Sequence, residues 1–101
     1  NSREKNPECF YEATCRIKND LKEQGIYANF EKTFLNWALD YAIWNISTLT
    51  DSDTKGKLAE KLTTNAYTEL EIQNHPWSYF DLYGAKMRTG FNELKRISTE
   101  R

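Results

Sequence analysis

The stretch NWALDYAIWNI, residues 36–46, decides the fold of this 101-residue chain. It sets two tryptophans and a tyrosine among aliphatic side chains, in a chain whose mean hydropathy is −0.83. A helix that is apolar nearly all round is buried by its neighbours. Residues 28–48 are therefore predicted to form the central helix. Its aromatic stripe recurs at helical spacing and comprises Phe30, Phe34, Trp37, Tyr41 and Trp44.

A narrow polar strip interrupts this apolar helix. It contains Thr33, Asn36, Asp40 and Ser47. Asp40 could be a buried functional acid, because perturbed acids mark functional sites. Its place on the strip instead favours contact with solvent or a hydrogen bond to a neighbouring element.

One helix is predicted before the central helix, and another directly after it. The first begins at Asn6-Pro7, since proline is tolerated at the first helical position. It ends at Gly25 in a Schellman motif, in which glycine takes the left-handed conformation. The third begins at the capping residues 50–53. Its apolar face comprises Leu58, Ala59, Leu62, Ala66 and Leu70.

A fourth helix follows the break at residues 73–76, where Pro76 disfavours helical structure in the residue before it. Ser78 is predicted to cap this helix, and Gly84 and Gly90 to weaken or kink it. One face carries Phe80, Tyr83, Met87, Phe91 and Leu94. The chain is thus predicted to be one all-α module over residues 1–101, a small four-helix bundle or orthogonal array around the helix at 28–48.

Composition excludes several classes of function. The net charge is −1, so no overall field favours nucleic acid. No apolar run approaches the roughly 20 residues of a transmembrane helix. Cys9 and Cys15 are six residues apart, about 240° around a helix, and cannot easily pair. We expect reduced thiols and a cytoplasmic location.

Two pairs of polar residues invite a catalytic or metal-binding interpretation. Asp51 and Asp53 form a D-x-D pair, and carboxylates suit hard cations. At a helix start, however, helix capping is favoured. His75 could act as an acid or base with Asp81, but a turn role is favoured. We therefore predict no catalytic, cofactor-binding or metal-binding residue in this chain, and regard the aromatic stripe as a structural hub or an interface.

The order of motifs resembles the C-terminal helical region of bacterial family 2 glycosyltransferases. Residues 7–27 read P-E-C-F-Y-E-A-x-C-x-I-K-N-x-L-K-E-x-G-I-Y, and residues 30–49 read F-x-K-T-F-L-N-W-A-L-D-Y-A-I-W-N-I-S-T-L. K-L-x-x-K-L, E-L-E-I and S-Y-F follow at 57–62, 69–72 and 78–80. The pattern departs at Glu71, where the family is expected to have glycine in an E-L-G-I ending.

The resemblance implies a fragment of an inverting GT-A enzyme of surface polysaccharide synthesis. The nucleotide-sugar site, the divalent metal and the base would lie in an upstream catalytic domain of the same chain, with no cofactor in this segment. This segment would brace that domain or mediate assembly, in the cytoplasm or at the inner face of the membrane. The alternative is a free-standing interaction module, including a homodimer, that buries its aromatic stripe in a partner.

Overall fold

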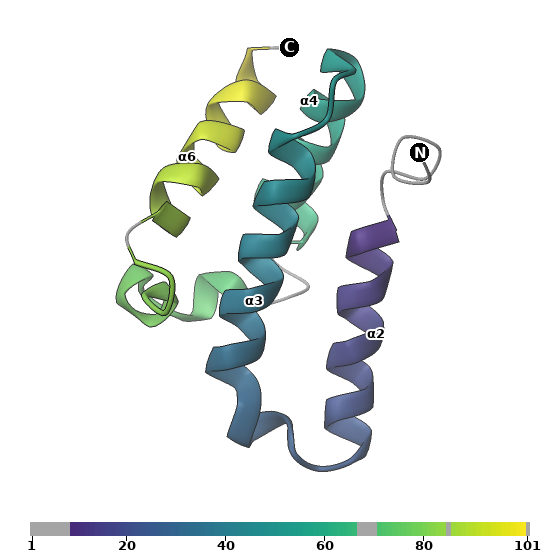
Figure 1. Ribbon diagram of the computed structural model, residues 1–101, viewed down its shortest axis with the longest axis vertical. Helices are drawn as coiled ribbons and strands as arrows, with labels where there is room; N and C mark the ends of the chain where they lie inside the picture. Colours follow the sequence, from purple (N-terminus) through teal and green to yellow (C-terminus); the bar gives the residue numbers. More distant parts are fainter. Residues whose placement is uncertain (1–8, 67–70, 85, 101) are drawn as a thin grey trace.

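A computed structural model describes residues 9–66, 71–84 and 86–100 (Figure 1). Within these ranges lie four α-helices: α2 (Cys9–Glu23), α3 (Tyr27–Ser47), α4 (Ser52–Lys61) and α6 (Lys86–Thr99). A π-helical turn spans Leu62–Ala66, and 3-10 turns span Ile72–Asn74 and Trp77–Phe80. These ranges contain no strand, so the prediction of an all-α fold is confirmed.

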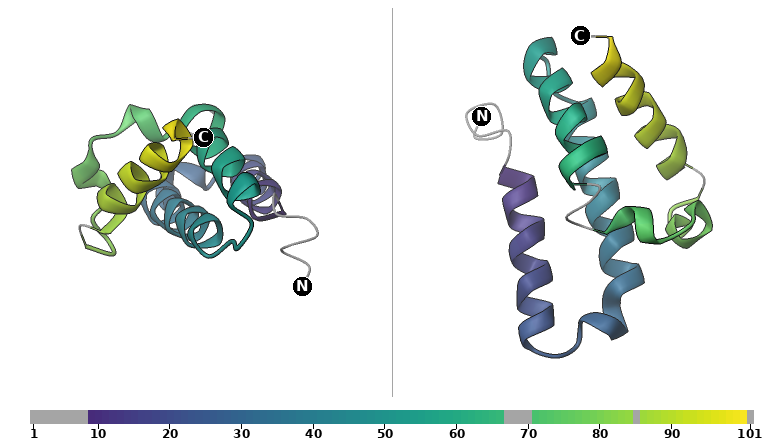
Figure 2. Two further views of the ribbon diagram at one scale, coloured as in Figure 1. Left: turned by 90° about the horizontal axis from the view of Figure 1, so that it is seen from above. Right: turned by 180° about the vertical axis from the view of Figure 1, so that it is seen from behind.

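Helix α3 occupies the centre of the molecule. In Figure 1, α2 and α6 lie on opposite sides of α3, and the view from behind in Figure 2 brings α4 in front of it. Each of these three helices contacts α3, as does the turn Trp77–Phe80, while α4 also packs along α6. None of the helices in the described ranges is long and apolar enough to cross a bilayer.

The core is built around the aliphatic side of α3. Leu39 and Ile46 are fully buried, and Leu35 and Ala38 are nearly so. Helices α4 and α6 and the turns complete the core with Leu58, Ala59, Leu62, Ile72, Phe80, Met87, Phe91 and Leu94. The prediction of a central apolar helix is confirmed, with bounds within one residue of those expected.

The end of α2 has the predicted Schellman geometry. Gly25 has φ +73°, the Ile26 amide donates to the Leu21 carbonyl at 3.1 Å, and the Gly25 amide donates to the Lys22 carbonyl at 3.0 Å. These two bonds satisfy carbonyls that the helix end leaves unpaired. The predicted start at Asn6-Pro7 lies outside the described residues.

The third helix is shorter than expected. Helix α4 ends at Lys61 and gives way to the π-helical turn, while Leu70 lies outside the described residues. Glu71 then adopts φ 62° and ψ 30°, the left-handed conformation. Glycine adopts this conformation without strain, so the structure has a left-handed residue where the family pattern is expected to have glycine.

The predicted fourth helix is wrong in its first half. Ser78 lies within the 3-10 turn Trp77–Phe80, and Gly84 has φ +81°. That left-handed glycine cannot belong to a continuous helix. Helix α6 therefore begins only at Lys86, and Tyr83 belongs to a separate turn at residues 82–84.

Candidate interaction surface

The predicted aromatic stripe of α3 divides between core and surface. Phe34 is buried, while Trp37 and Tyr41 are partly buried against the core. Phe30 and Trp44 are 49% and 56% exposed. We call Phe30, Trp37, Tyr41 and Trp44 the aromatic face.

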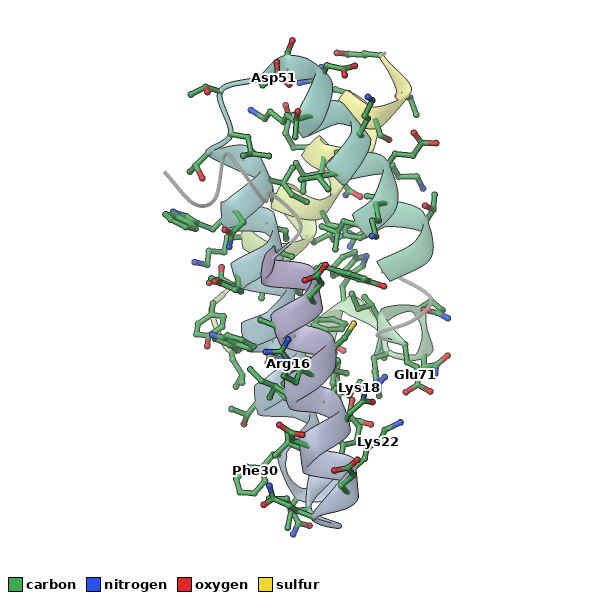
Figure 3. All side chains as sticks on the ribbon, turned by 90° about the vertical axis from the view of Figure 1, so that its right-hand side faces the viewer. Arg16, Lys18, Lys22, Phe30, Asp51 and Glu71 are labelled. Atoms are coloured by element: carbon green, nitrogen blue, oxygen red, sulfur yellow. The ribbon has the colours of Figure 1, made fainter. Side chains whose placement is uncertain are left out.

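The aromatic face is ordered by ring contacts along the helix. Trp37 stacks on Tyr41 with ring centroids 5.2 Å apart and 14° between the planes. Phe34 meets Trp37 at 6.1 Å and links the stack to the core. Phe30, Trp37 and Trp44 recur every seven residues, a spacing that keeps side chains on one side of a helix. Figure 3 shows Phe30 projecting away from the bundle.

The polar strip beside this face has two different roles. Asn36 is fully buried; its amide donates to the Tyr79 carbonyl at 3.0 Å, and its side-chain oxygen accepts from the Leu82 amide at 3.3 Å. Asp40 forms an ion pair with Lys86 of α6 at 3.0 Å. The sequence predicts that this strip either contacts solvent or forms hydrogen bonds to a neighbouring element. Asn36 forms such hydrogen bonds, and Asp40 is held by its ion pair with α6.

Asn36 thereby holds a second group of exposed apolar side chains beside α3. Leu82 and Tyr83 are 49% and 43% exposed, and the Lys86 ammonium lies 5.5 Å from the Tyr83 ring centroid. Sequence reasoning had placed Tyr83 on the apolar face of a helix. The available signal was Gly84, which could have marked a turn rather than a kink.

A second polar cluster joins α3 to the turns at 72–80. The Tyr79 hydroxyl donates to Glu31 Oε1 at 2.7 Å, and His75 Nε2 lies 3.4 Å from the same oxygen. The His75 ring stacks on Tyr79 with centroids 3.8 Å apart. Burial, and then the bond to Glu31, raise the pKa of Tyr79 well above its ordinary value, so the phenol stays protonated at neutral pH.

His75 and Asp81 are not brought together as a catalytic pair. Asp81 instead lies 3.4 Å from the Lys32 ammonium. His75 is held between the Tyr79 ring and the Glu31 carboxylate, consistent with a structural turn residue.

A third cluster connects α2 to Glu71. Lys18 Nζ donates to Glu71 Oε2 at 3.0 Å, and the Lys18 side chain is only 9% exposed. Figure 3 shows Lys18 and Lys22 on the side of α2 that faces Glu71. Their ammonium groups lie 5.7 and 5.3 Å from the Tyr27 ring centroid. The hydrogen bond from Lys18, together with its charge, lowers the pKa of Glu71.

Tyr27 leaves its hydroxyl in this cluster without a partner among the described residues. Burial raises the pKa of Tyr27 to about 12, and the charges of Glu31 and Glu71 add to the effect. A buried hydroxyl without a hydrogen bond costs stability. Sequence reasoning missed this cluster, because no local motif indicates that residues near 18, 27 and 71 meet.

The remaining candidate residues have structural roles. Asp51 caps α4 by accepting from the Thr54 amide at 2.9 Å, as predicted, and Asp53 pairs with Lys57 at 3.0 Å. Over the part of the chain that the structure describes, no three His, Cys, Asp or Glu side chains are grouped to hold a metal ion. Cys15 is a free, partly buried thiol whose pKa is raised by burial.

The surface of α3 and its surroundings therefore offer groups suited to contacts with another surface. They are the exposed rings of Phe30 and Trp44, the stacked pair Trp37 and Tyr41, and ion pairs such as Asp40–Lys86 and Lys32–Asp81. Comparison with models of protein families, with curated proteins and with solved structures finds no match for this chain.

Proposed function

We propose that this chain is a non-catalytic helical module of a nucleotide-sugar-dependent glycosyltransferase of surface polysaccharide synthesis. The aromatic face docks on the catalytic domain of the same longer protein and braces it. The observation that carries the proposal is the exposure of Phe30 and Trp44 on α3, the helix that supplies more buried core residues than any other described element. Clustered exposed apolar side chains are typical of surfaces that bind another protein surface.

Two further observations support the link to this enzyme family. The most distinctive part of the resemblance, residues 36–46, forms the middle of the central helix α3. Glu71, at the position where the family is expected to have glycine, has φ 62°, the left-handed value that glycine favours.

The polar residues that might have performed chemistry are engaged in other contacts. Asp51 caps a helix, Asp40 pairs with Lys86, and His75 stacks on Tyr79. Under the proposal, the metal and the nucleotide sugar belong to the catalytic domain.

The first test is to sequence the gene upstream of the codon for Asn1. An in-frame nucleotide-sugar-binding domain is expected, and its absence would overturn the glycosyltransferase assignment. The full-length protein would then be compared with a Phe30→Ser/Trp44→Ser variant by hydrogen exchange and by release of nucleoside diphosphate. In the double variant, we expect the amides of α3 to lose protection from exchange. The amides of the surface that α3 covers on the catalytic domain should lose protection as well.

Ile17→Ser is the matched control, because Ile17 is an exposed apolar residue on α2, 39% exposed, outside the aromatic face. It should leave both measurements unchanged. Equal protection in the double variant and the parent protein would contradict docking through the aromatic face.

A second candidate function is an antiparallel homodimer. Phe30 and Trp44 are each seven residues from Trp37, so the face is symmetric about Trp37. A two-fold interface requires that a surface complement itself, and here Phe30 would face Trp44 of the second copy. Sedimentation equilibrium tests this candidate: it requires a dimer that Phe30→Ser/Trp44→Ser dissociates, and a monomer at every concentration would reject it.

A further inference from the structure

A cavity lies between the turn Trp77–Phe80 and the first turns of α6. Its volume is about 410 Å³, and its walls include Trp77, Phe80, Asp81, Arg88 and Thr89. Small-molecule sites typically occupy about 300–1,000 Å³. The cavity shares no described residue with the aromatic face and is therefore a separate feature.

The apolar wall of the cavity is fixed by ring packing. Phe80 is 2% exposed, and Trp77 is partly buried against the core. The Trp77 ring meets Phe80 edge-on at 5.8 Å and Phe91 at 5.3 Å. A ring held in this way offers a surface that needs little ordering when a ligand binds.

The Arg88 guanidinium gives the cavity a positive charge that the described residues do not compensate. Arg88 is exposed, and no residue within the described ranges forms an ion pair or a hydrogen bond with its side chain. The Asp81 carboxylate, in contrast, pairs with the Lys32 ammonium at 3.4 Å. Arg88 also lies in the first turn of α6, where the helix dipole favours negative charge. These two features favour an anionic ligand.

The other lining residues restrict which anion fits. A dianion such as phosphate would bring a second negative charge close to Asp81, and it would have to lose water against Trp77 and Phe80, which is costly for a charged group. A carboxylate has a single charge and a planar shape that a guanidinium binds with two parallel hydrogen bonds. An aromatic or aliphatic body attached to the carboxylate would cover the apolar wall.

We infer that the cavity formed by Trp77, Phe80 and Arg88 binds a small monocarboxylate with an aromatic or aliphatic body. The carboxylate accepts hydrogen bonds from Arg88, and the body lies against the Trp77 ring. The inference does not depend on the proposed glycosyltransferase module or on docking through α3, because it concerns the chain alone.

The test is a titration of the ¹⁵N-labelled 101-residue chain at neutral pH with phenylacetate. The expected result is a saturable shift of the Trp77 indole N–H and of the Thr89 amide at millimolar concentrations. The Trp44 indole is the internal control and should not move. Two matched ligands separate the contributions: phenylacetamide lacks the charge, and acetate lacks the apolar body. Both should bind about tenfold more weakly than phenylacetate or less tightly still, because each loses one of the two contacts.

Arg88→Gln should weaken the binding of phenylacetate about tenfold, the loss expected for one charged hydrogen bond, and leave that of phenylacetamide unchanged. Comparing both ligands with both proteins isolates the charged contact from any change in the shape of the cavity. Asp81→Asn should strengthen the binding of phenylacetate by about two- to threefold, since it removes an exposed negative charge from the cavity wall. Both residues are exposed, so these changes leave the core intact.

Arg16→Gln is the matched control for the loss of a surface guanidinium. Arg16 is exposed on α2, away from the cavity (Figure 3), and its substitution should not change the binding of either ligand.

Four results would overturn the inference. The first two are the absence of a saturable Trp77 shift with phenylacetate and a parallel shift of the Trp44 indole. The third is equal affinity for phenylacetate and phenylacetamide, or an affinity ratio that Arg88→Gln leaves unchanged. The fourth is Arg88-dependent binding of acetate or inorganic phosphate as tight as that of phenylacetate, which would show that the aromatic wall contributes nothing.

Discussion

The Lys18 ammonium donates a hydrogen bond to the Glu71 carboxylate at 3.0 Å, joining two residues that are 53 positions apart. Glu71 thereby makes two opposing contributions to the stability of the fold. Its backbone has φ 62°, a conformation that costs a residue with a side chain about 1–2 kcal/mol. Its side chain neutralises a lysine that is 9% exposed. The ion pair explains why a glutamate can occupy a position that favours glycine.

The effect of Glu71→Gly should reverse in sign with the residue at position 18. In the parent chain, glycine relieves backbone strain but removes the carboxylate that accepts the hydrogen bond from the Lys18 ammonium. Because breaking a buried pair costs about 3–5 kcal/mol and Glu71 is partly exposed, we expect a net loss of about 1–2 kcal/mol. In a Lys18→Met background only the relief of strain remains, and the same change should stabilise by roughly 0.5–1 kcal/mol.

Urea unfolding of the four proteins in this cycle measures both effects. Equal changes in the free energy of unfolding in the two backgrounds would show that the ion pair does not offset the left-handed conformation. Glu71→Gln, which keeps a side chain and removes the charge, separates the two contributions.

The two tyrosines near Glu31 should respond in opposite directions to loss of the hydroxyl. Tyr79→Phe removes a hydrogen bond of 2.7 Å to a carboxylate and should cost about 1–2 kcal/mol. Tyr27→Phe removes a buried hydroxyl that has no partner among the described residues, and should be neutral or stabilising by up to about 1 kcal/mol. Thermal or urea unfolding at neutral pH makes the comparison, and a loss as large as that of Tyr79→Phe would mean that the Tyr27 hydroxyl has a partner.

The raised pKa of Tyr27 predicts how the stability of the folded chain changes in alkali. The pKa of Tyr27 is raised to about 12 in the folded chain, from an ordinary value of 10.0. Because the folded chain holds the Tyr27 proton more tightly than the unfolded chain does, the raised pKa contributes to the free energy of unfolding. This contribution is complete below the pKa of the unfolded chain, and is lost as the pH rises from about 10 to 12. Tyr27→Phe should lose stability less steeply across this interval, as measured by unfolding at a series of pH values. Parallel curves for the two proteins would contradict the raised pKa.

Much of the fold could be predicted from local patterns. The apolar periodicity of residues 28–48 predicted α3, and the Gly25 signal predicted the end of α2, because both depend on residues within a few turns. The π-helical turn at Leu62–Ala66 and the 3-10 turn at Trp77–Phe80 were missed, since they depend on packing against distant residues. The division of the aromatic stripe was left open for the same reason: helical spacing shows which rings share a side of α3, but not which sides its neighbours cover.

Gly90 of α6 lies against Ile43 of α3. A Cβ atom added there would lie 2.9 Å from Ile43 Cγ2, which is too close for an ordinary contact. Gly90→Ala should gain up to about 1 kcal/mol of helix propensity but lose about 1–3 kcal/mol to overpacking, for a net destabilisation. In an Ile43→Ala background the clash is absent, so the substitution should become stabilising. Unfolding free energies of the four proteins test this, and destabilisation in both backgrounds would contradict Ile43 as the obstacle.

Phe34 and Trp44 provide the clearest contrast between core and surface on one helix. Phe34 is 6% exposed and touches both Tyr27 and Trp37, so Phe34→Ala should cost about 3–5 kcal/mol. Trp44 is 56% exposed, and Trp44→Ala should change the free energy of unfolding by only about 0.5 kcal/mol. Urea unfolding of the isolated chain measures both costs. A loss for Trp44→Ala comparable to that for Phe34→Ala would place the indole in the core and remove the aromatic face as a docking surface. A small loss that accompanies weaker docking would show that this ring is kept for binding rather than for folding.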